Sequence, residues 1–383
     1  MANLFFYAYF LSALCFHHTG EPAGISPVTP STMYPDRTQN RIAERFDSLF
    51  AILSSQRGFN GNVLVSHNGK VLYKHAFGYS DLRRRTPLSI ESEFQLASVS
   101  KQFTSVAVMI LHDQQKVNFS DTLQKYFPDF PYQHITIREL LTHRSGLPDY
   151  MSFAAKYRDK HQEYISNADV MDMLTRYTPK AEFLPDQRYC YSNTGYAVLA
   201  ALVEKVSGMR FDEFMQQHVF TPLGMHNTYV FNPNVTRPVL PGRTIGHDKN
   251  RRPVFEDFLG GVVGDKGIYS TVEDMFKWDQ ALYTEALVRQ STLEEAFTPI
   301  SHDYRHNTNY GYGWRIKEMD GGSKIIYHAG WWRGYNSLYV RRREDKTSII
   351  VLSNKVNWSF RNIGTMFNLI DSPDINVTAM GGD

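Results

Sequence analysis

Hydrophobic and polar positions change their spacing several times along the chain, and the first changes mark a helix and a hairpin. Arg41–Leu53 places its apolar side chains on one face of a helix. Gly61–Ser66 and Val71–Gly78 have the pattern of two strands, and Asn68-Gly69 between them is a strong hairpin signal. The folded part of the chain is therefore predicted to begin with a helix followed by a β-hairpin.

The middle of the chain, from about residue 105 to residue 250, has mainly helical spacing. A nearly all-apolar helix follows Ser98 and is predicted to be buried. Further helices are predicted at Ile137–Leu141, Asn167–Thr175 and Asn193–Val206, and Gly208 ends the last of them.

Strand spacing returns near the C-terminus. Four segments alternate apolar and polar residues between glycines or charged turns: Gly311–Ile316, Lys324–His328, Tyr335–Arg343 and Thr347–Ser353. A closing helix is predicted at Asn357–Ile370. Because strands lie near both ends with helices between them, we predict an α/β fold of the α+β type. It has one antiparallel sheet flanked by helices, with an inserted all-helical domain.

This pattern predicts a discontinuous domain organisation. Residues 41–105 and 251–371 are assigned to the α/β sheet domain, and residues 106–250 to the mainly helical domain. Residues 1–20 are predicted to be a signal segment and residues 21–40 a flexible lead-in. Residues 372–383 form a predicted C-terminal tail.

The apolar run Leu4–Leu14 is too short to span a bilayer. With the Pro- and Thr-rich stretch that follows, it predicts an exported protein, periplasmic or extracellular, although no Lys or Arg precedes the run. Cys15 offers a lipoprotein alternative, but Leu14 is a poor residue to precede a lipidated cysteine. Loss of the leader would leave only Cys190, without an internal disulfide. No other segment is predicted to be a stable membrane span.

Composition narrows the classes of partner. The chain has 383 residues, with 41 basic and 39 acidic side chains and a formal charge of +2, so no nucleic-acid partner is expected. There is no Gly-rich phosphate loop and no G-x-S-x-G elbow. His302 and His306 are four residues apart without H-E-x-x-H or a third ligand, so we predict no metal and no cofactor.

Ser98 and Lys101 form the single S-x-x-K motif of the chain. Positions i and i+3 share a helix face, so Lys101 is expected beside the Ser98 hydroxyl at a helix N-terminus. Burial would lower the pKa of Lys101 and let it accept a proton from the serine nucleophile. The structural alternative is a helix-capping serine with a surface lysine.

Tyr191-Ser192-Asn193 lies at the start of another predicted helix. The Tyr191 phenol between an ammonium and a serine could move a proton to the leaving group, and Asn193 could hold Lys101 or a substrate carbonyl. The alternative is a helix cap with a packed aromatic ring.

His328-Ala329-Gly330 is predicted to end a strand. The small residues would let a substrate backbone lie along the strand, and the N–H groups of Trp331 and Ser98 could form an oxyanion hole. The alternative is an ordinary strand and turn.

The order and the surroundings of these motifs resemble the serine β-lactamase and penicillin-binding-protein superfamily, in its class C β-lactamase-related branch. Seven ordered blocks carry the resemblance: residues 94–101, 140–148, 191–196, 222–225, 267–274, 310–314 and 328–330. The resemblance implies Ser98 as the acylated nucleophile and Lys101 with Tyr191 as the general base pair. His328 stands at the family's lysine–threonine–glycine position.

Two further expectations depend on that resemblance. His143 and Ser145 belong to a loop block with a structural role at the turn of Gly146. A histidine in place of the usual lysine, with an ordinary pKa near ~6.5, would attract a substrate carboxylate weakly and more strongly as pH falls. The sequence therefore predicts that uncharged esters are turned over better than β-lactams.

Together these observations predict a serine hydrolase that forms an acyl-enzyme at Ser98. Its substrate would be a small ester, an amide or a D-amino-acid peptide, which could be derived from the cell wall. The alternatives are a β-lactamase or D-alanyl-D-alanine carboxypeptidase, a penicillin-binding sensor or binding module with little turnover, and a silent homologue. The substrate-binding residues are predicted to be Asn193, His328, Gly330 and Trp331.

Overall fold

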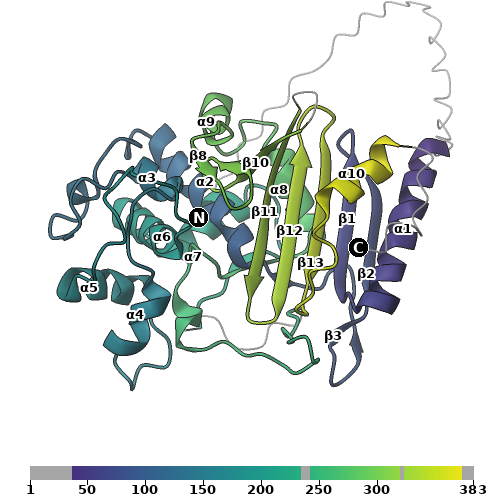
Figure 1. Ribbon diagram of the computed structural model, residues 1–383, viewed down its shortest axis with the longest axis horizontal. Helices are drawn as coiled ribbons and strands as arrows, with labels where there is room; N and C mark the ends of the chain where they lie inside the picture. Colours follow the sequence, from purple (N-terminus) through teal and green to yellow (C-terminus); the bar gives the residue numbers. More distant parts are fainter. Residues whose placement is uncertain (1–36, 234–241, 320–322, 373–383) are drawn as a thin grey trace, which may run out of the picture. The chain divides into compact units, whose positions relative to one another are not determined.

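An eight-stranded antiparallel sheet organises the computed structural model, which describes residues 37–233, 242–319 and 323–372 (Figure 1). The strand order is β2-β1-β13-β12-β11-β10-β9-β8, so the first hairpin pairs with the last strand. The strands are β1 (Gly61–His67), β2 (Lys70–Phe77), β8 (Ser301–Asp303), β9 (Thr308–Tyr310), β10 (Arg315–Glu318), β11 (Lys324–Trp332), β12 (Tyr335–Arg342) and β13 (Thr347–Ser353). This sheet and its flanking helices confirm the predicted fold class.

Alternation along the strands gives the sheet two buried faces. In β13, Ile349 and Val351 join one hydrophobic cluster, and Ile350 and Leu352 join another on the opposite face. Successive strand side chains point to opposite faces, so one period-2 segment supplies both clusters. The first face is covered by α1 (Arg37–Arg57) and α10 (Ile363–Asp371), and the second by α8 (Val272–Ala281) (Figure 1).

The remaining helices lie beyond α8, on the side of the sheet away from α1 (Figure 1). They are α2 (Ser100–Asp113), α3 (Ile137–Leu141), α4 (Tyr150–Tyr157), α5 (Asn167–Tyr177), α6 (Asn193–Ser207), α7 (Phe211–Met215) and α9 (Gln290–Ala296). Phe103 of α2 stacks on Trp278 of α8 with ring centroids 4.0 Å apart, which joins the helices to the sheet.

Two small sheets complete the fold. One pairs β3 (Tyr79–Asp81) with β4 (Thr86–Pro87). The other has the order β5-β7-β6, with β5 (Phe94–Gln95), β7 (Ile268–Ser270) and β6 (Tyr229–Val230). Because β5 runs directly into the Ser98 segment, this sheet fixes the entry to the predicted site.

The predicted strand Gly311–Ile316 is wrong over its first four residues, whereas Arg315 and Ile316 belong to β10. Gly311 N–H donates to the Trp314 carbonyl at 3.0 Å, and Gly313 has a φ of +90°, so residues 311–314 form a turn between β9 and β10. Tyr312 and Trp314 are buried in the core from that turn. Their burial produced an alternating pattern without a strand.

Other boundaries also differ. The strand predicted to end at 328–330 continues to Trp332, because a two-residue turn at Arg333-Gly334 returns the chain directly into β12. The closing helix begins at Ile363, since Asn357 N–H donates to Asn336 and its own carboxamide accepts from Ser359 N–H in a turn.

The predicted signal segment, Cys15, residues 21–36 of the lead-in and the tail from residue 373 lie outside the described residues. Residues 37–40 of the lead-in form the first turn of α1. The described residues form one compact unit, and the division at residues 105 and 250 stays a prediction. Among the described residues, no helix is both long and apolar enough to cross a membrane.

Candidate active site

Ser98 lies in a 3₁₀ turn, Ala97–Val99, directly ahead of α2. The sequence predicted a helix beginning at or just before Ser98, whereas α2 begins at Ser100. Ala97 has a φ of +49°, a left-handed conformation that is uncommon outside glycine. This turn still leaves the half-buried Ser98 hydroxyl at the N-terminal end of the helix.

Strand β11 approaches this turn at Gly330. A Cβ at residue 330 would lie 3.0 Å from Ala97 Cβ and still closer to the Leu96 carbonyl and the Ser337 hydroxyl. Ser337 Oγ donates a hydrogen bond of 2.5 Å to that carbonyl, which ties β12 to the same turn. Glycine at 330 therefore permits the contact between the sheet and the Ser98 segment.

The second edge of β11 is open beside Ser98. β10 pairs with β11 only through Lys324–Tyr327. From His328 to Trp332, no other strand of the described chain lies on that edge. Trp331 lines the cavity with Ser98 and is 54% exposed. An extended substrate can therefore pair with this edge, as the sequence predicted.

Lys101 is fully buried and reaches Ser98 from the next helical turn. Its Nζ donates to Asn193 Oδ1 at 2.8 Å and to the Asp265 carbonyl at 2.9 Å, and lies 3.4 Å from Ser98 Oγ. Burial lowers the pKa of Lys101 to about 8, against the attraction of Asp265. The predicted proximity and the predicted direction of the pKa shift are both confirmed.

Tyr191 and Asn193 come from the start of α6. Ser192 caps the helix, accepting from Gly195 N–H at 3.1 Å, which fixes Asn193 as its first residue. The Tyr191 ring centroid lies 4.8 Å from Lys101 Nζ. Burial raises the pKa of Tyr191, and a hydrogen-bonding contribution from the Ser98 hydroxyl opposes the rise. Tyr191 Oη is buried without a hydrogen bond of good geometry to any described residue, and Tyr191 lines the cavity together with Ser98.

His143 holds the Tyr191 segment from both sides. Its Nδ1 accepts from Ser192 N–H at 3.1 Å, and its carbonyl accepts from Cys190 N–H at 2.8 Å. The sequence assigned this residue to the turn at Gly146, where Ser145 Oγ accepts from Leu147 N–H at 3.4 Å. The structural role of His143 therefore extends to the position of the phenol, which only the folded chain reveals.

His328 lines the cavity but is held by both ring nitrogens. Nδ1 lies 2.8 Å from the Ala329 carbonyl, and Nε2 lies 3.1 Å from Tyr310 Oη. A carbonyl only accepts, so Nδ1 carries the proton and Nε2 accepts from the phenol. Burial, with the positive charges of Arg315 and Lys101, lowers the pKa of His328 well below its usual value. The expectation that His328 titrates near neutral pH and attracts a carboxylate is wrong.

Positive charge in the cavity comes instead from residues that the sequence reasoning missed. The cavity has a volume of about 670 Å³, and Arg315, Lys317 and Arg361 line it together with Ser98. No Asp or Glu is among its lining residues in the described chain. Arg315 pairs with Asp303 at 2.7 Å behind the cavity wall. Desolvation and the charge of Arg315 lower the pKa of Arg361 to about 10.

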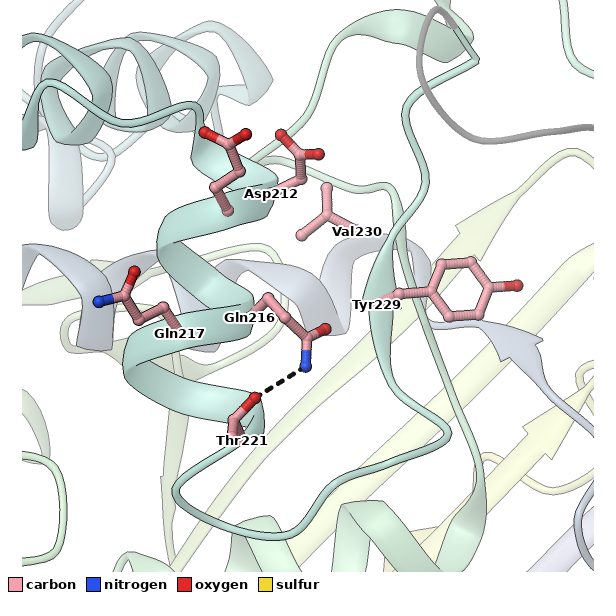
Figure 2. Close-up of a pocket in the computed structure, with 7 residues that line it drawn as sticks. Asp212, Gln216, Gln217, Thr221, Tyr229 and Val230 are labelled. Carbon is pink, nitrogen blue, oxygen red and sulfur yellow. Dashed lines mark hydrogen bonds between the residues drawn. The ribbon is translucent and has the colours of Figure 1, made fainter. Parts of the chain in front are cut away.

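A second cavity, of about 700 Å³, lies beside α7 and β6 (Figure 2). Gln216 donates to Thr221 Oγ1 at 3.0 Å, and the acidic Asp212 pairs with Arg210 at 2.7 Å. No lysine or histidine joins Thr221 in its lining. Among the described residues, this lining therefore has no serine–lysine pair like that of Ser98 and Lys101.

The described chain offers no group of three His, Cys, Asp or Glu side chains that could hold a metal ion. His306, which the sequence compared with His302, pairs with Asp303 at 2.7 Å at the cavity rim.

The sequence is similar to those of known proteins. The family model described as Beta-lactamase matches residues 42–369. Penicillin-binding protein 4* of Bacillus subtilis (strain 168) is 34% identical over 324 residues, which cover 82% of this chain and 72% of that protein. D-aminopeptidase of Brucella anthropi is 25% identical over 305 residues, which cover 79% of this chain and 57% of that relative.

Solved structures share the fold. The penicillin binding protein from Bacillus halodurans has a TM-score of 0.73 and 25% identity, covering 84% of this chain and 98% of that one. The D-amino acid amidase from Ochrobactrum anthropi SV3 has a TM-score of 0.71 and 22% identity, covering 88% and 97%. With the family match across residues 42–369, these likenesses establish that the chain belongs to the Beta-lactamase family.

Proposed function

We propose that this protein, a serine hydrolase of the β-lactamase family, forms a covalent acyl-enzyme at Ser98. Its proposed substrates are small peptides or amides with a free carboxylate beside the bond that is broken. One observation carries the proposal: the buried Lys101 Nζ lies 3.4 Å from the Ser98 hydroxyl at a cavity of about 670 Å³.

Acylation begins when neutral Lys101 accepts the Ser98 proton. Ser98 Oγ then forms a bond to the substrate carbonyl carbon, and the carbonyl oxygen takes up the negative charge between the N–H groups of Ser98 and Trp331. Collapse of this intermediate breaks the bond to the leaving nitrogen. The nitrogen receives a proton from Tyr191, which regains one from Lys101. Water then hydrolyses the ester and returns Ser98.

The proposed carboxylate preference follows from the charges in the cavity. Arg315, Lys317 and Arg361 line it, and no acidic side chain of the described residues does. A guanidinium binds a carboxylate through paired N–H donors, and the binding is stronger in a partly desolvated site. The sequence alone favoured uncharged esters, because His328 was expected to be the residue that binds a substrate carboxylate and to bind it weakly. His328 is neutral and supplies no charge, so the preference for a carboxylate depends on Arg315, Lys317 and Arg361 instead.

The relatives support a peptide or amide substrate without fixing it. Penicillin-binding protein 4* is the relative with the higher identity, and D-aminopeptidase is the more distant one. A cavity lined by cations disfavours the positively charged amino group of an aminopeptidase substrate. We therefore place the carboxypeptidase type first, and export would bring such an enzyme to cell-wall peptides.

Covalent labelling tests the nucleophile. Ser98→Ala should abolish labelling by a fluorophosphonate or β-lactam probe, and mass spectrometry should place the wild-type adduct on Ser98. Ser100→Ala is the matched control, because Ser100 Oγ is buried and accepts from Ile268 N–H at 3.3 Å. An adduct on Ser100 or Ser192 would contradict the proposal. Stable labelling without turnover would indicate a penicillin-binding sensor instead.

Paired substrates test the carboxylate preference. A peptide ending in D-Ala-D-Ala should be cleaved faster than the same peptide with a C-terminal amide. Arg361→Gln should reduce that ratio of kcat/KM about tenfold, the scale of one charge-assisted hydrogen bond. Arg361 has no carboxylate partner among the described residues, so this variant leaves no acid unpaired. Equal rates on both peptides, unchanged by Arg361→Gln, would contradict the carboxylate preference and favour uncharged esters as substrates.

A further inference from the structure

A buried pair of opposite charges lies behind Lys101. Asp265 and Lys266 are adjacent in sequence, both are almost fully buried, and their side chains approach to 3.4 Å. Lys266 Nζ also donates to Tyr150 Oη at 2.8 Å and to the Val262 carbonyl at 2.9 Å. Tyr150 Oη in turn donates to Asp265 Oδ2 at 3.0 Å. Burying two charges costs free energy of desolvation, so an ion pair buried beside the proposed base suggests a role in the site.

The segment that carries this pair is held rigidly. Asn167 bonds the Val263 carbonyl and N–H at 2.8 and 2.9 Å, and Thr104 Oγ1 donates to the Gly264 carbonyl at 2.7 Å. Gly264 has a φ of +97°, and a Cβ there would lie 2.6 Å from Ala200 Cβ. The backbone therefore has one position against α2 and α6.

This position brings the pair to Lys101. The carbonyl of Asp265 accepts from Lys101 Nζ at 2.9 Å, so the same residue supplies both a direct ligand and a nearby negative charge. Burial lowers the pKa of Lys266, Asp265 and Glu256 oppose that shift, and the charge of Lys101 adds to it, so the two ammonium groups repel each other. The other titratable or charged groups around Lys101 are Asp149, Arg315, His143, His328, Tyr191 and Tyr196.

We propose that Asp265 and Lys266 are positioning residues that set the protonation of the catalytic Lys101 from behind the site. Asp265 holds the Lys101 ammonium in place and favours its charged form. Lys266 offsets part of that attraction, which keeps the neutral form of Lys101 accessible near physiological pH. This inference rests on the proposed function, because it assigns the pair to the base of that reaction.

The two charges must act with opposite sign. Loss of the Asp265 charge removes an attraction and lowers the pKa of Lys101. The pH at which the acylation rate rises to half its maximum therefore moves down. Loss of the Lys266 charge removes a repulsion and exposes Asp265, so this pH moves up. A role confined to stability would not produce two shifts of opposite direction.

The test measures the rate of Ser98 labelling by a fluorophosphonate from pH 5 to pH 10. Asp265→Asn should shift the midpoint down by about one pH unit, and Lys266→Met should shift it up by about one unit. The double variant should lie between them, near the wild-type protein. Tyr150→Phe is the matched control, because it removes a hydroxyl from the same network without changing a charge, and its midpoint should stay in place.

Folding of each variant is checked by circular dichroism and thermal unfolding. If one single variant does not fold, the other is compared with the double variant, since removal of Asp265 must lower the midpoint and removal of Lys266 must raise it in either background. Midpoints that shift in the same direction, or not at all, would overturn the inference. If no charge variant folds while Tyr150→Phe does, the pair is a stability element and the inference is equally wrong.

The outcome separates this inference from the proposed function. An unlabelled Ser98 in wild-type protein contradicts the acyl-enzyme. A labelled Ser98 whose pH midpoint ignores Asp265 and Lys266 contradicts only the assignment of this pair.

Discussion

Replacement of Gly330 by alanine tests whether the close contact of β11 with the Ser98 turn is needed for catalysis. The added Cβ would lie 3.0 Å from Ala97 Cβ and closer still to the Leu96 carbonyl and the Ser337 hydroxyl. Carbon atoms pack best at about 3.5–4.0 Å, so the strand and the turn must separate by roughly 1 Å. Gly330 does not have a positive φ, so the contact alone sets the cost.

The expected loss follows from that displacement. A misplacement of about 1 Å in a catalytic geometry costs about 10²-fold in rate. Here it would move the Trp331 N–H away from Ser98, which separates the two proposed oxyanion donors. We expect kcat/KM and the labelling rate to fall about 10²-fold. Overpacking should reduce the free energy of unfolding by about 1–3 kcal/mol, which can leave the protein folded.

The assay pairs fluorophosphonate labelling with urea unfolding of the same samples. Gly364→Ala is the matched control, because Gly364 also lines the cavity, whereas its added Cβ would meet only Asn362 Oδ1 at 3.4 Å. Gly364→Ala should stay within about twofold of the wild-type rate, since ordinary contact needs no displacement. If Gly330→Ala is as active as Gly364→Ala, the close approach of β11 is not part of the catalytic geometry.

Three further results are expected. Lys101→Arg should lose most activity, because a guanidinium cannot be deprotonated at the pH of the assay, and Tyr191→Phe should lower turnover about 10²–10⁴-fold. Near-wild-type rates of both variants in steady-state assays would mean that other residues transfer the proton. The wild-type labelling rate should rise with pH to a midpoint near the Lys101 pKa of about 8, with no second step near ~6.5, because burial keeps His328 neutral; a step there that His328→Asn removes would contradict this. Burial lowers the pKa of His143 as well as that of His328, so below about pH 6.5 the unfolded chain binds more protons than the folded chain. The free energy of unfolding should therefore fall as pH falls, by up to about 1.4 kcal/mol per pH unit for each histidine. Urea unfolding at several pH values measures this dependence on pH, which should be weaker in His328→Asn.

Local patterns in the sequence determined much of the fold and the centre of the site. The β1–β2 hairpin, α3 and β13 lie where the spacing of apolar residues predicted them, β13 at its predicted bounds. The proximity of Ser98 and Lys101 was also predictable, because residues three apart lie on one face in a 3₁₀ turn as well as in an α-helix. The motif at Tyr191 needed the resemblance as well, since its distance to Lys101 depends on how α6 packs.

Only the tertiary structure decided the charges of the site. Burial and the charge of Arg315 lower the pKa of His328, Tyr310 holds its Nε2 from β9, and no local pattern records this packing. Arg361 enters the same cavity from the segment before α10, and Asp265 reaches Lys101 from the loop before β7. A pKa depends on desolvation and on charges within a few ångströms, whichever part of the sequence supplies them. The sequence therefore determined which groups can react, and the packing of distant segments decided which of them are charged.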